Sequence, residues 1–207
     1  MLFYQTIDTS TLELLKKLLG ITVFKDMRLA GGTSLALQLG HRKSIDLDLF
    51  GSLQADDITF SGALSVFEKV SWLKKTPNIN IFSINGIKVD FVNYPYPWIN
   101  ETIIADELRL AGLKDIAAMK LAAVTGRGTR KDFIDIYFLL EQFTLKKMME
   151  FYTKKYTDGS PFLVLKSLTY FDDAELEQEP VMFKNISWQA VKQKLLKKHG
   201  EYLKSLN

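Results

Sequence analysis

The stretch Ala30–Phe50, AGGTSLALQLGHRKSIDLDLF, decides the fold class of this chain. It begins with two glycines and two hydroxyl residues, continues with an apolar helical pattern that ends at Gly40, and closes with alternating polar and apolar residues. We expect a glycine-rich turn, a helix over Thr33–Leu39 and a strand over Ser44–Phe50 with one polar face. Because glycines let backbone N–H groups approach an anion closely, the turn is a candidate phosphate site. An ordinary turn that caps a helix is the alternative.

The polar face of the expected strand carries Asp46 and Asp48, whereas Ile45, Leu47 and Leu49 fall on the apolar face. Alternate residues of a strand point the same way with Cα atoms ~6.5 to 7 Å apart, so the two carboxylates repel each other unless a cation lies between them. Mg²⁺ (or Mn²⁺) is commonly held by one or two carboxylates together with substrate phosphates. We therefore expect a divalent cation at this pair. An exposed polar strand face is the alternative.

A third aspartate, Asp90, interrupts the apolar strand expected over Ile87–Asn93. An Asn-Gly pair, the most favoured two-residue hairpin turn, joins that strand to another over Ile79–Ile84. If the strand lies beside the one with the two aspartates, Asp90 becomes a third ligand. Three such carboxylates would hold two metal ions, one activating the attacking oxygen and one steadying the leaving phosphate. A solvent-facing aspartate on an edge strand is the alternative.

Two helical patterns follow, over Leu113–Val124 and Lys131–Phe143. Lys120 lies in the apolar stripe of the first and therefore requires an anion, either a carboxylate or a bound triphosphate, unless its side chain reaches solvent from the rim. Asp132 is interpreted as a partner of the helix dipole at the N-terminus of the second. Asp135, one turn further on, has no such explanation.

Other elements are expected from local signals. Ser10 and Glu13 predict a capping box for a helix that ends at Gly20. A short strand is expected over residues 27–30 and a further helix over residues 55–69. The fold class is therefore α+β, with a small mixed or antiparallel sheet flanked by helices and a mainly helical C-terminal lobe. We place the division between residues 1–110 and 111–207.

Composition excludes several classes of site. The 207 residues include no cysteine and only two histidines, which leaves oxygen as the main metal ligand. There is no signal-like start and no apolar run of about 18 residues, so we expect a cytoplasmic protein with no membrane partner. The net charge of +3 is too small to indicate nucleic acid. The tail over residues 184–207 has six lysines and one acid, typical of a solvated basic face or of a face that contacts RNA phosphates.

Five segments occur in a recognisable order: GGTS, RKSIDLD, KVDF, DIAAMKLAA and RKDFIDIYFLL. Together they resemble the AbiEii/AbiGii family of nucleotidyltransferase-like toxins over roughly residues 28–143, and the later SLTYFDDAE with Trp188 resembles the tail of many members. The resemblance implies a nucleotidyltransferase fold of the DNA polymerase β type, which binds an NTP and Mg²⁺ between a small sheet and a helical lobe.

The resemblance also implies roles for particular residues. The NTP phosphates would be bound by Gly31, Gly32, Thr33 and Ser34, with Arg42 and Ser44 matching the arginine and serine before the aspartate pair. The metal ligands would be Asp46 and Asp48, with Asp90 as a third carboxylate. Lys120 and Asp135 match a later lysine and aspartate of the family, so that the candidate catalytic residues are Asp46, Asp48, Lys120 and Asp135.

The implied reaction is transfer of a nucleoside monophosphate from an NTP to a hydroxyl group, with release of pyrophosphate. Relatives are toxins of toxin–antitoxin or phage-defence modules, some of which modify the acceptor end of tRNA, so tRNA and a cognate antitoxin protein are expected partners. Two other functions stay open: a small-molecule nucleotidyltransferase that modifies an antibiotic hydroxyl, and a non-catalytic module that binds an NTP or a partner.

Overall fold

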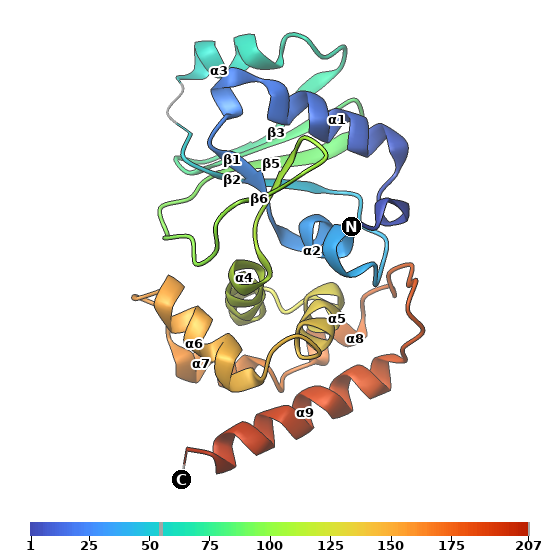
Figure 1. Cartoon of the computed structure of the whole chain (residues 1–207), viewed down its shortest axis with the longest axis vertical. Coiled ribbons are helices and arrows are strands. Elements are labelled where there is room, and N and C mark those ends of the chain that lie inside the picture. Colours follow the sequence, from blue (N-terminus) through green and yellow to red (C-terminus); the bar gives the residue numbers. More distant parts are fainter. Residues whose placement is uncertain (54–55, 207) are drawn as a thin grey trace. The chain divides into compact units, whose positions relative to one another are not determined.

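The computed structural model describes residues 1–53 and 56–206, which form two compact units. Met1–Tyr96 and Glu101–Ala111 make up a unit built around a sheet, here called the sheet unit. Pro97–Asn100 and Gly112–Asn207 make up a unit built of helices, the helical unit. Figure 1 shows the first in blue to green and the second mainly in yellow to red. The main division follows residue 111, and the short segment 97–100 belongs with the helices.

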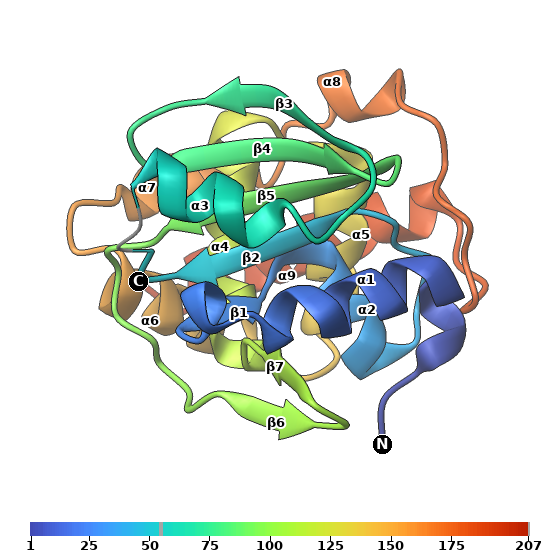
Figure 2. The ribbon, with the colours of Figure 1, turned by 90° about the horizontal axis from the view of Figure 1, so that it is seen from above.

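The sheet unit contains a mixed sheet with the strand order β3-β4-β5-β2-β1-β7-β6 in the described part of the chain, as Figure 2 shows. The strands are β1 Met27–Leu29, β2 Leu47–Gly51, β3 Val70–Lys75, β4 Ile79–Ile84, β5 Ile87–Asn93, β6 Ile103–Ala105 and β7 Leu108–Leu110. β2 pairs with β5 in parallel and β1 pairs with β7 in parallel, whereas the other neighbours are antiparallel. The expected α+β class with a small mixed sheet is therefore confirmed.

The sheet unit also contains α-helices and short 3-10 helices. They are η1 Tyr4–Thr6, α1 Thr9–Gly20, η2 Thr22–Phe24, α2 Gly31–Leu39 and α3 Asp57–Leu64. Figure 1 shows α1 and α3 on the same side of the strands. Leu15 and Leu18 of α1 lie in one core with Leu47, Leu49 and Phe91 of the sheet, all fully buried. Because side chains alternate along a strand, Asp48 and Asp90 point to the opposite face.

The expected β4–β5 hairpin is confirmed. Ile79–Ile84 and Ile87–Asn93 pair antiparallel on either side of Asn85 and Gly86, whose φ angles are 52° and 83°. Two positive φ values at the central positions are what a type I′ turn requires, and Asn-Gly adopts them at little cost.

Two expected helix boundaries are wrong. α1 begins at Thr9 with Asp8 as its N-cap residue and has no side-chain cap, so Ser10 lies inside the helix and cannot form a capping box with Glu13. α3 covers only Asp57–Leu64, with the Asp56 side chain accepting from Thr59 N–H. Ala55, the expected start of that helix, lies outside the described residues. After α3 the chain turns into β3, an edge strand for which the sequence gives no periodic signal.

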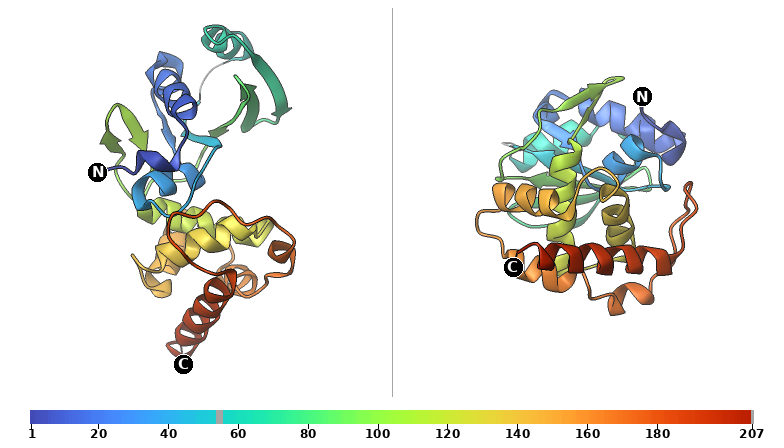
Figure 3. Two further views of the ribbon diagram at one scale, coloured as in Figure 1. Left: turned by 90° about the vertical axis from the view of Figure 1, so that its right-hand side faces the viewer. Right: turned by 60° about the horizontal axis from the view of Figure 1, so that its bottom comes forward.

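The helical unit contains α4 Leu113–Gly126, α5 Arg130–Leu139, α6 Leu145–Lys155, α7 Pro161–Ser167, α8 Asp172–Glu175 and α9 Trp188–Lys204. α4 packs against α5, α6 and α7, and α9 packs against α5 and α6, as Figure 3 shows. The two expected helices are present, but the first includes Gly126, and the second ends at Leu139 instead of Phe143. Within the described residues, no helix is both long and apolar enough to cross a membrane.

Candidate active site

The N-terminus of α2 forms one side of the candidate site in the sheet unit. Ala30 precedes the helix in an extended conformation, and its N–H donates to the carbonyl oxygen of Asp48 at 2.8 Å. The helix has no side-chain cap, and within the described residues the N–H groups of Gly31, Gly32 and Thr33 donate to no other group. Unused N–H groups and the positive end of the helix dipole coincide there, which favours binding of an anion.

Gly31 brings this helix terminus against the carboxylate of Asp48. Its φ angle is +62°, and a Cβ atom at position 31 would lie 2.2 Å from Asp48 Oδ2. Glycine is therefore required twice, by the backbone conformation and by the absence of space for a side chain. α2 begins two residues earlier than expected, because both glycines belong to the helix rather than to a turn before it.

Gly32 contacts a second charged group. A Cβ atom there would lie 2.4 Å from Arg42 Nη2 and 3.5 Å from Ser44 Oγ. Arg42 is buried, and its Nη1 donates to Lys43 O at 3.1 Å. A guanidinium beside the positive end of a helix is stabilised when an anion lies near both. The structure thus brings Arg42 and Ser44 to the glycine-rich turn, as the expected phosphate site requires.

The hydroxyl groups of Thr33 and Ser34 are directed into the protein. Both residues are buried; Thr33 Oγ1 donates to the carbonyl oxygen of Asp46 and lies 2.8 Å from Ser44 Oγ. Ser34 Oγ accepts from Gln38 Nε2 at 3.1 Å. These bonds join the turn to the strand that follows, and they leave the backbone N–H groups of the turn as its outward donors.

Asp46 and Asp48 lie at the start of β2. The strand begins at Leu47, later than expected, because Asp46 O is bound by Thr33 and the N–H of Ser44 donates to Thr6 O at 2.8 Å. Ile45 is consequently 52% exposed instead of sharing the buried face of Leu47. Within residues 1–53 and 56–206, the carboxylate of Asp46 has no hydrogen-bond or ion-pair partner.

Asp90 lies directly opposite Asp48, since the parallel ladder of β2 and β5 pairs the two residues. The expectation that these strands are neighbours is confirmed. However, Lys88 Nζ lies 2.7 Å from Asp90 Oδ1 and 2.8 Å from Oδ2. Among the described residues, no group of three His, Cys, Asp or Glu side chains is arranged to hold a metal ion. Asp46 and Asp48 remain a pair of oxygen donors that suits Mg²⁺ once substrate oxygens complete the shell.

Lys120 in α4 binds two carboxylates of α5. Its Nζ lies 2.8 Å from Asp132 Oδ1 and 2.7 Å from Asp135 Oδ2, and its side chain is only 6% exposed. The lysine therefore does not reach solvent from the rim of its stripe, and the required anion is a carboxylate pair. This cluster lies wholly in the helical unit, whereas the other candidate residues lie in the sheet unit.

Asp132 has further partners in this cluster. Besides Lys120, it accepts from Arg127 Nε at 3.0 Å and from Thr129 Oγ1 at 2.6 Å. Burial by itself would raise the pKa of Asp132, but the charges of Lys120 and Arg127 and the hydrogen bonds of Lys120 and Thr129 outweigh burial and hold the pKa at about 2. The interpretation of Asp132 as a dipole partner alone is wrong, because three donors converge on its carboxylate. The sequence did not show this convergence.

Three of the six lysines of the basic tail form ion pairs within the helical unit. Lys192 pairs with Glu175, Lys194 with Glu141 and Lys198 with Glu201, at 2.5, 3.4 and 2.7 Å. The SLTYFDDAE segment is held at the same place, since Trp188 Nε1 donates to Glu175 Oε2 and Arg130 donates to the carbonyl oxygens of Ala174 and Glu175. These contacts favour a structural role for the tail over an RNA-binding one.

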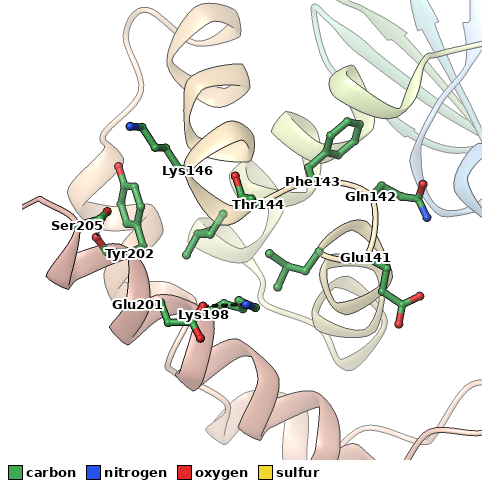
Figure 4. A pocket seen from close by; sticks show the side chains of 11 residues that line it. Glu141, Gln142, Phe143, Thr144, Lys146, Lys198, Glu201, Tyr202 and Ser205 are labelled. Atoms are coloured by element: carbon green, nitrogen blue, oxygen red, sulfur yellow. Dashed lines mark hydrogen bonds and ion pairs between the residues drawn. The ribbon is translucent and has the colours of Figure 1, made fainter.

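A groove of about 480 Å³ lies in the helical unit where the corner between α5 and α6 meets the end of α9, as Figure 4 shows. Its lining includes Phe143, Lys146, Lys198, Glu201 and Tyr202. The Lys198–Glu201 ion pair lies within it. None of the residues expected to bind an NTP or a metal lines this groove.

A mixed sheet with paired aspartates, next to the uncapped N-terminus of a helix that begins with two glycines, is the arrangement of a nucleotidyltransferase. The family described as "Nucleotidyl transferase AbiEii toxin, Type IV TA system" matches residues 13–201, and the chain belongs to this family. An uncharacterized protein of Aquifex aeolicus (strain VF5) is 34% identical over 201 residues, which cover 93% of this chain and 96% of that protein.

Solved structures agree on the fold. A putative nucleotidyltransferase from H. pylori superposes with a TM-score of 0.60 at 17% identity, covering 97% of this chain and 99% of the other. MenT4, a nucleotidyltransferase toxin from Mycobacterium tuberculosis H37Rv, gives a TM-score of 0.54 at 14% identity, covering 93% of this chain and 82% of the toxin. The expected resemblance and the nucleotidyltransferase class are thus confirmed.

Proposed function

We propose that this chain transfers a nucleoside monophosphate from an NTP to a hydroxyl group of tRNA, with Mg²⁺ as cofactor. The observation that carries the proposal is the contact of Asp48 with Gly31, which sets a carboxylate against a helix end whose first three N–H groups donate to no other group among the described residues. The phosphate oxygens of a nucleoside triphosphate can accept hydrogen bonds from these N–H groups and bind a divalent cation at the same time.

The residues of the sheet unit have separate tasks in this proposal. The N–H groups of Gly31, Gly32 and Thr33 bind phosphate oxygens, and Arg42 supplies a permanent positive charge beside them. Asp46 and Asp48 hold the cation. When bound, Mg²⁺ neutralises phosphate charge and orients the triphosphate. Ser44 supports the turn through its contact with Thr33.

The reaction follows from this placement. The acceptor oxygen attacks the α-phosphorus, the bond from that phosphorus to its bridging oxygen breaks, and pyrophosphate leaves with the bonding electrons. The proton of the acceptor hydroxyl passes to a carboxylate or to water. Because such a transfer demands positioning and charge stabilisation more than covalent chemistry, few protein groups suffice.

Lys120 and Asp135 enter the proposal as a catalytic pair of the helical unit. The geometry supports one defined task for them, which is to join α4 to α5 through a buried ion pair. A lysine whose charge is held in place this way keeps a fixed position on its helix. Loss of either residue would therefore reduce activity through the arrangement of the helices as well as through charge.

Membership of a toxin family supports a toxin role and a cognate antitoxin as partner. The choice of tRNA as acceptor goes beyond that and needs a direct test. Purified protein would be incubated with Mg²⁺, each α-labelled NTP in turn and total tRNA. An Asp46→Asn/Asp48→Asn variant would serve as the inactive form, and Asp57→Asn, an exposed aspartate of the same unit, as the matched control.

Label on RNA with the wild type and with Asp57→Asn, but not with the double variant, is the expected result. No label on RNA, with NTP binding that the double variant loses in calorimetry, would contradict tRNA as acceptor and favour a small-molecule hydroxyl or a binding role. Equal NTP binding by the wild type and the double variant would contradict the proposed cation site itself.

A further inference from the structure

Asp90 is placed where a second metal ion would be expected. It lies directly opposite Asp48 in the parallel ladder, so the two side chains leave the same face of the sheet from strands ~4.8 Å apart. Two-metal transferases use such neighbouring carboxylates to hold two cations a few ångströms apart. The position of Asp90 therefore matches that of a ligand for a second metal ion, whereas its contact with Lys88 does not.

Both oxygens of Asp90 face the ammonium group of Lys88. The lysine lies two residues earlier on β5 and therefore on the same face, with Nζ 2.7 Å from Oδ1 and 2.8 Å from Oδ2. The side chain of Asp90 is 17% exposed and that of Lys88 is 43% exposed. The carboxylate is thus largely withdrawn from water, while its counterion comes from the solvent side.

A cation from solution must displace this ammonium before it can bind Asp90. A divalent cation at Asp90 would contact its carboxylate oxygens, and here both lie within 2.8 Å of Lys88 Nζ. Oδ2 accepts a hydrogen bond from the ammonium group, whereas Oδ1 is buried and has no hydrogen-bond partner among the described residues. The ammonium group of Lys88 repels an incoming cation. Because this group is part of the chain, it is present at every concentration of the divalent cation. Asp46 has no such protein counterion in the part of the chain that the structure describes.

We propose that Lys88 replaces the second divalent cation at Asp90, so that the protein binds a single divalent cation, through Asp46 and Asp48. The inference rests on the proposed function and specifies the cation requirement of the same site. It assigns Asp90 as the anchor of a lysine instead of a metal ligand. Lys88 then contributes a fixed positive charge on the face of the sheet that carries Asp48.

The test counts Mn²⁺ ions bound to the full chain in the absence of nucleotide, by calorimetry and by electron paramagnetic resonance. The variants are Lys88→Met, Lys88→Gln, Asp90→Asn and the Lys88→Met/Asp90→Asn pair. Lys75→Met is the matched control, because Lys75 pairs with an aspartate elsewhere in the sheet unit. Thermal melting checks that each variant is folded.

We expect Lys88→Met and Lys88→Gln each to gain one Mn²⁺ site, which Asp90→Asn abolishes in the paired variant. Lys75→Met should match the wild type, and Asp90→Asn alone should leave wild-type Mn²⁺ affinity unchanged. If Asp90→Asn weakens Mn²⁺ binding to the wild type by about tenfold or more, or if both Lys88 variants gain no site, the proposal is overturned.

These outcomes are separable from failure of the proposed function. The gained site depends on Lys88 and Asp90 and needs neither nucleotide nor turnover. Absence of an Asp46- and Asp48-dependent Mn²⁺ site in the wild type would overturn the single-cation assignment and count against the proposed function. A gained site in the Lys88 variants would still show that the lysine excludes a cation from Asp90.

Discussion

Gly31 lies so close to Asp48 that a Cβ atom at position 31 would come within 2.2 Å of Asp48 Oδ2. The contact couples a backbone requirement to the chemistry of the site, because any side chain there must displace the carboxylate. Gly31→Ala should therefore lower both stability and NTP binding. A positive φ alone costs a non-glycine residue about 1 to 2 kcal/mol.

The measurement is urea unfolding together with calorimetric NTP binding. Gly62→Ala is the matched control, since Gly62 lies in α3 with open space around its Cα and should gain up to about 1 kcal/mol from the higher helix propensity of alanine. Unchanged NTP affinity in a folded Gly31→Ala variant would contradict the role given to this contact.

Lys120→Met should destabilise the protein by about 3 to 5 kcal/mol, because it leaves the buried carboxylates of Asp132 and Asp135 without their shared ammonium group. Lys147→Met removes an exposed pair with Glu150 and should cost no more than about 0.5 kcal/mol. Chemical unfolding at neutral pH measures both. Similar losses from the two variants would show that the buried cluster contributes little to folding.

The low pKa of Asp132 predicts an acid-dependent loss of stability. Because the folded-state pKa of about 2 lies below the ordinary value of 3.8, the unfolded chain binds the proton more tightly. This contribution is complete above the ordinary pKa and is lost as pH falls through the folded-state value. A shift of this size corresponds to about 2 kcal/mol.

Unfolding free energies measured at intervals between about pH 5 and pH 2 should therefore fall less steeply for Asp132→Asn than for the wild type. Asp173→Asn, an exposed aspartate of the same unit, provides the control. Identical slopes for the wild type and Asp132→Asn would indicate that other carboxylates dominate acid unfolding.

The ion pairs of the tail predict a limited effect of its lysines on RNA binding. Lys192→Ala should loosen the contacts of Glu175 and Trp188, with a small loss of stability and little change in the salt dependence of tRNA binding. Each lysine that truly contacts a phosphate would reduce the salt slope by about 1. Filter binding at several salt concentrations distinguishes the two roles, and a slope reduced by that amount would establish an RNA-contacting tail.

Local chemistry made much of this fold predictable. The β4–β5 hairpin follows from an Asn-Gly pair between two apolar runs, and the end of α2 follows from Gly40, which adopts a φ of 64°. Both signals act over a few residues, so no knowledge of distant partners is needed. The acid pair and the glycine-rich turn were visible for the same reason, as was the family resemblance that they carry.

The partners of the charged residues were decided by tertiary structure. Sequence shows that Lys120 needs an anion, but only the packing of α4 against α5 shows that two carboxylates supply it. The register of β2 with β5, which sets Asp90 opposite Asp48, depends on strands about 40 residues apart. Short edge strands such as β6 are too brief to carry a period and are stabilised by their neighbour. The sequence therefore determined which residues are chemically capable, and the long-range pairing of strands and helices determined which charges meet, because an ion pair depends on distance in space rather than along the chain.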